Sequence, residues 1–277
     1  MDLQQLCQTF VNLRKRWPHD WPGLPRVVNS ALLQLGHSPG ARLPQRYQAM
    51  LDCVTSIAQR IEHDGAQKSK VSLEPSYHNR LHISDTVVAL TTLLLAQRSC
   101  QGQSSPSMLL PHEWQMFLAI CSHDLFHSGK INQFTSEIEG QSVAALTPLM
   151  QMCGVHEDDQ KAVSHMILQT DPTLVKESHQ KVRGRVFDDR QLPCQTVLVQ
   201  EADIMASAMP DIGDGLTHQL SDEWRTVDPS RSKSLLSKQS RIFFLREFAL
   251  FSSPASQVLG IQSVIDRQIK DLSQAID

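Results

Sequence analysis

The chain has 277 residues, with 26 Lys and Arg against 29 Asp and Glu and a formal net charge of -3. This length favours one large domain over two complete enzymes, and a hydrophobic content of 40% is enough for a sizeable core. The slightly negative charge argues against a nucleic-acid polymer or an anionic membrane as the main partner.

The cysteines and the N-terminus indicate a cellular compartment. Six cysteines are scattered without a CxxC pair, which is typical of reduced intracellular thiols. The first residues include an acid at position 2 and no long apolar stretch, unlike a secretory signal. No window reaches the roughly 18 apolar residues of a membrane span. The sequence therefore predicts a soluble, cytoplasmic protein.

Apolar residues recur three or four positions apart along most of the chain, as in Leu51, Val54, Ile57, Ala58 and Ile61. This spacing is typical of helices with one buried face, and the alternation expected of strands is hard to find. The pattern predicts a compact, all-α fold of about ten helices.

Stretches rich in Pro, Gly and Ser indicate breaks between the helices. They cover residues 17–25, 37–40, 65–75, 99–111 and 182–193. Residues 1–70 contain no cluster of potential ligands, so we expect a helical packing segment there and a catalytic region over 71–277, within one globular unit. The last helix is expected from Pro254 to about Ala275, with an apolar stripe for core packing or dimerisation. A monomer and a homodimer are both compatible with it.

The first residues with chemical potential are His78 and His82, in the segment Tyr77-His78-Asn79-Arg80-Leu81-His82. If the run after Pro75 opens a helix, histidines four positions apart lie on one face, about one turn from each other. Both rings then address one point.

A second group follows the apolar residues 117–122, which lead into His123 and Asp124. Burial of such a pair is costly without a partner or a metal. Asp203 is a further acid in an apolar segment. With His82, these residues make a set of two imidazoles and two carboxylates, which suits a borderline divalent metal such as zinc or iron. Asp124 has a second oxygen that can reach a harder ion.

A single histidine or His-Asp pair is weak evidence. His19-Asp20 lies in a Trp- and Pro-rich break, and His63-Asp64 precedes the polar stretch that begins at Gly65. Lone histidines are more often surface or core residues than ligands. The ordered set of a histidine pair, a buried His-Asp and an isolated buried Asp favours a metal site.

These segments resemble the class I cyclic-nucleotide phosphodiesterases, within the HD-domain metal-dependent phosphohydrolases. Tyr77-His78-Asn79-x-x-His82-x-x-Asp85 is similar to the family's YHNxxHxxDV segment, and His123-Asp124-x-x-His127-x-Gly129-x-x-Asn132-x-Phe134 is similar to its HDxxHxGxxNxF segment. Thr170-Asp171 and Ala202-Asp203-Ile204 resemble two further blocks. The chain departs from the pattern at Thr86, where valine is usual, and at Phe126, where an acid is frequent.

The resemblance implies an all-helical domain with two divalent metals. Zinc or iron at the first site would be held by four residues: His82, His123, Asp124 and Asp203. Asp124 would also reach magnesium or manganese at the second site. His127 would lie next to the ligands without binding the metal itself, and would orient a metal-bound water or a ligand.

The resemblance also implies a reaction, the hydrolysis of a 3′,5′-cyclic nucleotide such as cAMP or cGMP to the 5′-monophosphate. A hydroxide that bridges the metals would attack phosphorus, and His78 would protonate the departing O3′. A histidine suits this step because its ordinary pKa of about 6.5 lies near working pH. Glu139 is the best match to the family's site glutamate, with Glu137 as the rival.

The resemblance further implies substrate contacts. Tyr77 would touch the substrate, Gln239 would read the purine, and Ile242 or Phe243 would form a clamp around it. The alternative for residues 238–244 is an ordinary amphipathic helix with its aromatic residues in the core. Ala206 stands where the family commonly has asparagine, which puts the substrate more in doubt than the metal site.

Two other functions stay open. One is an HD-type phosphohydrolase that acts on another nucleotide phosphoester, which the departure at Ala206 favours. The other is a non-catalytic metal-binding scaffold, which is disfavoured because the four expected ligands and His78 occur together.

Overall fold

The computed structural model describes residues 2–102 and 108–274. These residues form helices and no strand, which confirms the all-α prediction with more helices than expected. The helices are α1 (Leu3–Arg16), α2 (Leu24–Gln34), α3 (Gln45–Lys70), α4 (Arg80–Cys100), α5 (Pro111–Ser122), α6 (Glu137–Cys153), α7 (Glu157–Leu168), α8 (Pro172–Val182), α9 (Leu192–Ala208), α10 (Pro210–Trp224), α11 (Pro229–Leu235), α12 (Lys238–Glu247), α13 (Pro254–Val258) and α14 (Ile261–Gln274).

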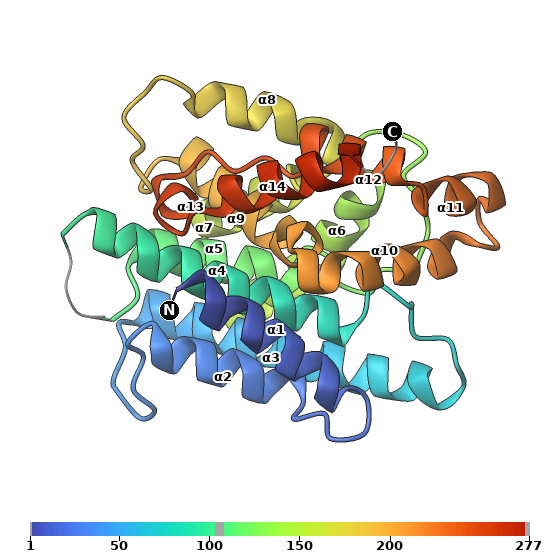
Figure 1. Ribbon diagram of the computed structural model, residues 1–277. Coiled ribbons are helices and arrows are strands. Elements are labelled where there is room, and N and C mark those ends of the chain that lie inside the picture. Colours follow the sequence, from blue (N-terminus) through green and yellow to red (C-terminus); the bar gives the residue numbers. More distant parts are fainter. Residues whose placement is uncertain (1, 103–107, 275–277) are drawn as a thin grey trace.

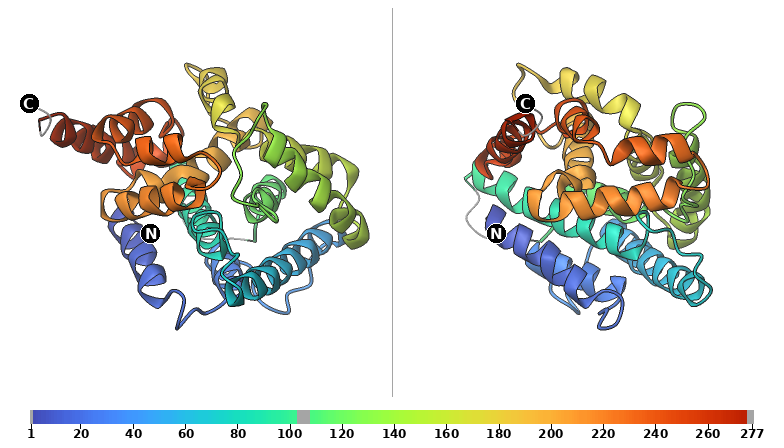
Figure 2. Two further views of the ribbon diagram at one scale, coloured as in Figure 1. Left: turned by 90° about the vertical axis from the view of Figure 1, so that its right-hand side faces the viewer. Right: turned by 45° about the vertical axis from the view of Figure 1, so that its right-hand side comes forward.

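Helix α4 runs through the centre of the molecule (Figure 1) and packs against α1, α2, α5, α9 and α13. Val87, Leu90 and Leu93 on α4 are fully buried. Helices α1 to α3 lie on one side of α4, and the C-terminal helices from α9 onward lie on the other (Figure 2). Because α4 contacts both α5 and α9, residues from three distant parts of the sequence can meet beside it.

The N-terminal helices are attached to α4 by packing and by one ion pair. Leu6, Phe10 and Ile57 belong to the same hydrophobic core as the residues of α4. The guanidinium of Arg14 on α1 binds the buried carboxylate of Asp85 on α4 through two hydrogen bonds of 3.0 and 2.5 Å. Residues 1–70 therefore support the helix from which the site is built.

The predicted break at residues 65–75 begins six residues too early. Gly65 lies inside α3, which continues to Lys70. A Cβ atom at Gly65 would lie 2.6 Å from Cδ of Arg80 and 2.7 Å from Oε1 of Glu74. Glycine is thus required here by close approach between α3 and the start of α4, and not by a turn.

The other predicted breaks separate helices, although residues 103–107 of the break at 99–111 lie outside the described residues. The expected helix from Pro254 to Ala275 is interrupted at Gly260. The φ of Gly260 is 72°, in the left-handed region, and this residue separates α13 from α14. Residue 275 lies outside the described residues. Ile261 and Ile265 of the predicted stripe are buried, so this face serves core packing. No helix within 2–102 and 108–274 has the length and apolar character needed to cross a bilayer.

Candidate metal centre

Four donor groups from α4, from the end of α5 and from α9 come together. His82 lies in the first turn of α4, His123 and Asp124 directly follow α5, and Asp203 lies on α9. Nε2 of His82 lies 3.2 Å from Oδ2 of Asp124 and 3.3 Å from Oδ1 of Asp203. Nε2 of His123 lies 3.2 Å from each of the same oxygens, and the two Nε2 atoms are 3.3 Å apart.

These spacings fit a shared metal ion. Two nitrogen or oxygen ligands of one zinc ion, each at about 2.0–2.2 Å, lie about 3.3–3.6 Å apart in tetrahedral geometry. His82 and His123 are buried, and in the described chain the ion pairs of Asp124 and Asp203 involve these histidines rather than Lys or Arg. A dication would satisfy both carboxylates, so the donor set suits the zinc or iron that the sequence predicts.

The electrostatics of the cluster show how strongly its members interact. Burial alone would lower the pKa of His82, but the hydrogen bonds with Asp124 and Asp203 outweigh it and raise this pKa to about 9. Burial would raise the pKa of Asp203, but the charge of His123 and its hydrogen bond lower it below the ordinary value. The two carboxylates therefore favour positive charge at this point, which a bound cation would also supply.

Hydrogen bonds with backbone groups orient two of the ligands, His123 and His82. Nδ1 of His123 donates to the carbonyl oxygen of Ile120, at 2.9 Å, which leaves Nε2 free to act as a ligand. Oδ1 of Asn79 accepts from the backbone N–H groups of Leu81 and His82, at 2.9 and 3.1 Å, and so caps α4. This cap fixes the turn that carries His82.

The cap also corrects the expected position of His78. Because α4 begins at Arg80, His78 precedes the helix and does not share a helical face with His82. The two rings nevertheless approach each other, with centroids 5.8 Å apart. The loop before Asn79, and not helical periodicity, brings His78 to the site.

Glu223 at the end of α10 holds His78 in place. Its Oε1 lies 2.5 Å from Nδ1 of His78, and its Oε2 accepts from the backbone N–H groups of Tyr77 and His78 at 2.7 and 3.0 Å. Burial would raise the pKa of Glu223, but the charge of His78 and these hydrogen bonds lower it. Sequence reasoning missed this residue, because one Glu in an amphipathic helix carries no local pattern.

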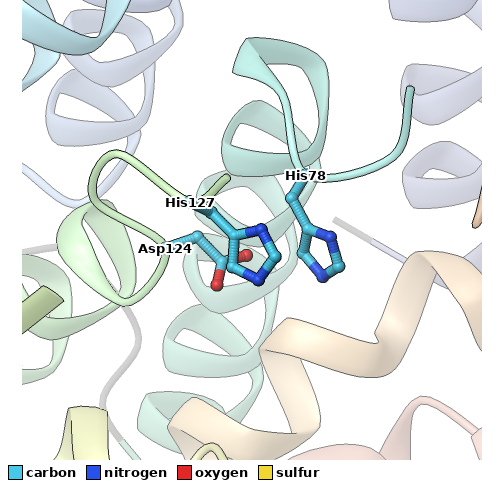
Figure 3. Close-up of side chains that lie close together, drawn as sticks. All are labelled: His78, Asp124 and His127. Carbon is cyan, nitrogen blue, oxygen red and sulfur yellow. The ribbon is translucent and has the colours of Figure 1, made fainter. Parts of the chain in front are cut away.

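Figure 3 shows His78, Asp124 and His127, a second group of possible ligands that shares Asp124 with the four donors described above. Their donor atoms lie within 4.8 Å of one another. The rings of His78 and His127 stack, with centroids 3.8 Å apart and planes inclined by 25°. Burial and the neighbouring His78 lower the pKa of His127 to about 4. Nδ1 of His127 accepts from the backbone N–H of Gly129 at 3.0 Å. Asp124 therefore lies where two cations could share it.

Glu139 and Glu137 have different surroundings. Oε2 of Glu139 accepts from Nδ2 of Asn132 at 2.9 Å. Burial raises its pKa, and the negative charges of Asp171 and Asp124 add to this. The carboxylate of Glu137 accepts from the backbone N–H of Gln133 at 2.7 Å and so closes the loop before α6. Of the two glutamates, Glu137 stabilises the loop before α6, and Glu139 is the one that binds Asn132.

Asp171, in a further block that resembles the family, has a structural position. It is buried, caps α8, and its Oδ2 accepts from the backbone N–H of Ser136 at 2.5 Å and from Nδ2 of Asn132 at 3.3 Å. It therefore anchors the loop that carries Asn132.

The predicted substrate contacts lie in different places. The hydroxyl group of Tyr77 is 2.8 Å from Oγ of Ser207, and its ring centroid is 4.9 Å from that of His82. On α12, Ile242 is buried, whereas Gln239 is exposed and 59% of Phe243 is exposed, with its ring against Phe248. The structure thus brings Tyr77 to the cluster but shows no contact of Gln239, Ile242 or Phe243 with it.

Comparisons with known proteins place this geometry in a known fold. No protein-family model and no curated protein sequence matches the chain. Among solved structures, LmjPDEB1 of Leishmania in complex with IBMX aligns with 97% of this chain and 91% of its own, at a TM-score of 0.66 and 12% identity. The phosphodiesterase domain of Salpingoeca rosetta rhodopsin phosphodiesterase aligns with 99% of this chain and 88% of its own, at a TM-score of 0.56 and 16% identity. The chain therefore has the fold of these phosphodiesterases, as its motifs implied.

Proposed function

We propose that this chain is a metal-dependent phosphodiesterase that hydrolyses a 3′,5′-cyclic nucleotide, cAMP or cGMP, to the 5′-monophosphate. The observation that carries the proposal is that Nε2 of His82 and Nε2 of His123 lie 3.3 Å apart and each lie 3.2–3.3 Å from a carboxylate oxygen of Asp124 and of Asp203. The fold shared with two phosphodiesterases supports it.

The residues of the cluster provide positions for two metal ions in the proposed reaction. The four donors would hold zinc or iron, and Asp124 would also reach magnesium or manganese at a second position, with water as the other ligands. Divalent cations bound there would supply positive charge that polarises the phosphate and lowers the pKa of bound water.

His78 is the proton donor of the proposed reaction. Glu223 binds its Nδ1, so the other ring nitrogen, Nε2, is left to deliver a proton to the departing O3′ as the ring of the cyclic nucleotide opens. The ring stacks on His127, and burial favours the neutral form of that neighbour. Glu139, held by Asn132, is the proposed acceptor of the proton that the attacking water gives up.

The proposal is tested by hydrolysis. Purified protein is incubated with cAMP or cGMP and with added Mg²⁺ or Mn²⁺, and the 5′-monophosphate is quantified. His78→Ala should lower kcat by about 100-fold or more while the four-donor cluster keeps its metal. The control is His218→Ala, an exposed histidine on α10, which should retain wild-type activity.

Each result separates the proposal from its alternatives. Hydrolysis of either nucleotide that depends on His78 supports a phosphodiesterase and ranks the purines. Bound metal without hydrolysis of either nucleotide would contradict the proposal and favour another phosphoester as substrate. A protein with neither metal nor activity would be a scaffold with this fold.

A further inference from the structure

Arg241 on α12 carries a buried positive charge without a buried acid to balance it. Its relative exposure is 7%. Among the described residues, the one carboxylate within 4.0 Å of its guanidinium is that of Asp214, whose side chain is 84% exposed. A buried charge is costly unless it is paired and hydrogen-bonded. The position of Arg241 in the fold therefore needs a reason other than an ion pair.

The guanidinium of Arg241 binds the C-terminal end of α9. Its Nη1 donates to the carbonyl oxygen of Ser207 at 2.7 Å, and its Nη2 donates to Oε1 of Gln268 on α14 at 3.0 Å. Nε2 of Gln268 donates to the carbonyl oxygen of Ala208 at 2.8 Å. The last carbonyl groups of a helix have no partner within that helix. Two side chains from later helices thus supply the hydrogen bonds that the end of α9 lacks.

Gly213 on α10 leaves the space that this contact needs. A Cβ atom there would lie 2.5 Å from the carbonyl oxygen of Ser207 and closer still to Nη2 of Arg241. Glycine inside a helix is less favourable than alanine, so the close approach of the guanidinium explains the residue at position 213. The sequence of α10 is therefore adapted to the contact between Arg241 and the end of α9.

Ser207 connects this end of α9 to the metal centre. Its hydroxyl group lies 2.8 Å from the hydroxyl group of Tyr77. The ring of Tyr77 packs against the rings of both His78 and His82, with centroids 4.7 and 4.9 Å apart. Asp203 lies one turn before Ser207 on the same helix. The hydroxyl group of Ser207 is thus the link between the anchored helix end and the aromatic ring beside the site.

We infer that Arg241 and Ser207 are positioning residues, which hold the ring of Tyr77 in the orientation that places His78 for proton transfer. The inference rests on the proposed function, in which His78 protonates the departing O3′. Glu223 holds one atom of the His78 ring, and the Tyr77 ring, inclined to it by 74°, limits its tilt. Helices α12 and α14 thus act on the reaction through the end of α9.

Four variants separate this route from a general loss of structure. Ser207→Ala removes only the linking hydroxyl group, and Tyr77→Phe removes its partner. Arg241→Met removes the guanidinium but keeps an apolar stem, and it is also combined with Ser207→Ala. The control is Thr196→Val, which removes a buried hydroxyl group that donates to the carbonyl oxygen of Leu192 within α9.

Each single substitution except the control should lower kcat by about 3- to 10-fold, which corresponds to the net contribution of one hydrogen bond. KM should change by less than about twofold, because His78 acts in the transition state. When Ser207→Ala is already present, Arg241→Met should lower kcat no further, although it lowers the melting temperature in both backgrounds. A merely structural role predicts the same further loss of kcat in both. The zinc content should stay at the wild-type value.

A second readout requires no turnover. The ring C–H signals of His78 are recorded by NMR on the protein loaded with zinc and magnesium, and they are identified by their absence in His78→Ala. Because the Tyr77 ring lies against His78, a change in its orientation shifts these signals. Ser207→Ala and Arg241→Met should shift them, and Thr196→Val should leave them unchanged. If Arg241→Met does not fold, Ser207→Ala and Tyr77→Phe carry the test.

Three results would overturn the inference: wild-type kcat in Ser207→Ala, additive losses of kcat in the double variant, or loss of zinc from Arg241→Met, which would place its effect at Asp203. The proposed function fails separately. A wild type that hydrolyses no cyclic nucleotide, but whose His78 signals shift in Ser207→Ala and Arg241→Met, refutes only the function. Hydrolysis of cAMP or cGMP with unshifted His78 signals in both variants refutes only the positioning role.

Discussion

Nδ1 of His78 lies 2.5 Å from Oε1 of Glu223, a residue 145 positions later in the chain. The second oxygen of the same carboxylate accepts from the backbone N–H groups of Tyr77 and His78. One buried carboxylate therefore fixes both the ring and the loop that carries it. This contact joins the start of α4 to the end of α10 and sets the direction of the proposed proton donor.

Glu223→Gln should lower kcat by about 10- to 100-fold with little change in metal content. The amide can still accept one hydrogen bond, but it no longer compensates a positive charge on His78. Steady-state kinetics and elemental analysis check this. Asp222→Asn is the control, because Asp222 is exposed and pairs with Arg225. Wild-type kcat in Glu223→Gln would show that His78 needs no anchor.

Gly129→Ala should destabilise the protein by about 1–2 kcal/mol and also lower activity. The φ of Gly129 is 73°, and a Cβ atom there would lie 3.0 Å from Cγ of Glu223. The added methyl group therefore strains the backbone and displaces the anchor of His78. The free energy of unfolding in urea measures the first effect.

Gly140→Ala is the matched control for that substitution. Gly140 lies inside α6, and a Cβ atom there meets nothing within 4 Å. Alanine should raise the free energy of unfolding by about 0.5–1 kcal/mol, because it favours the helix. Equal effects of the two substitutions would contradict the close approach between Gly129 and Glu223.

Arg14→Leu should destabilise the protein by about 3 kcal/mol, because it leaves the buried carboxylate of Asp85 without its partner. Burial already raises the pKa of Asp85 despite the charge of Arg14. The double substitution with Asp85→Asn should recover part of the loss, since the uncompensated charge is gone. A double-mutant cycle in urea measures this coupling, and additive losses would show that the pair is not coupled.

His179 gives the stability a dependence on pH. Burial lowers its pKa to about 4, below the ordinary value of about 6.5. The folded state therefore binds fewer protons than the unfolded state between these values, and stability present above pH 6.5 is lost as the pH falls towards 4. From pH 7 to pH 4.5, the free energy of unfolding should fall by about 2–3 kcal/mol more in the wild type than in His179→Gln. The same fall in both proteins would contradict the assignment.

The sequence predicted the residues of the cluster better than the contacts that position them. His82, His123, Asp124 and Asp203 stand out locally, because polar groups in apolar helices need partners. Their meeting depends on the packing of α4, α5 and α9 against one another, which local sequence patterns do not show.

Long-range contacts explain what could not be predicted. Glu223 looks like any acid on a helix surface, and its role follows only from the packing of α10 beside the loop at His78. The prediction of a turn at Gly65 was wrong. Glycine is needed there because the side chain of Arg80, from another helix, lies too close for a Cβ atom. The asparagine cap at the start of α4 has a local pattern, and placing it correctly would have removed His78 from the helix.

The central claim is that the four donors hold a divalent cation, and elemental analysis of the purified protein tests it directly. The wild type should retain about one equivalent of zinc or iron after dialysis without chelator. Asp203→Ala should lose most of that metal, while Asp211→Ala, an exposed acid on α10, should retain it. Equal metal content in Asp203→Ala and the wild type would contradict the assignment of the cluster as a metal centre.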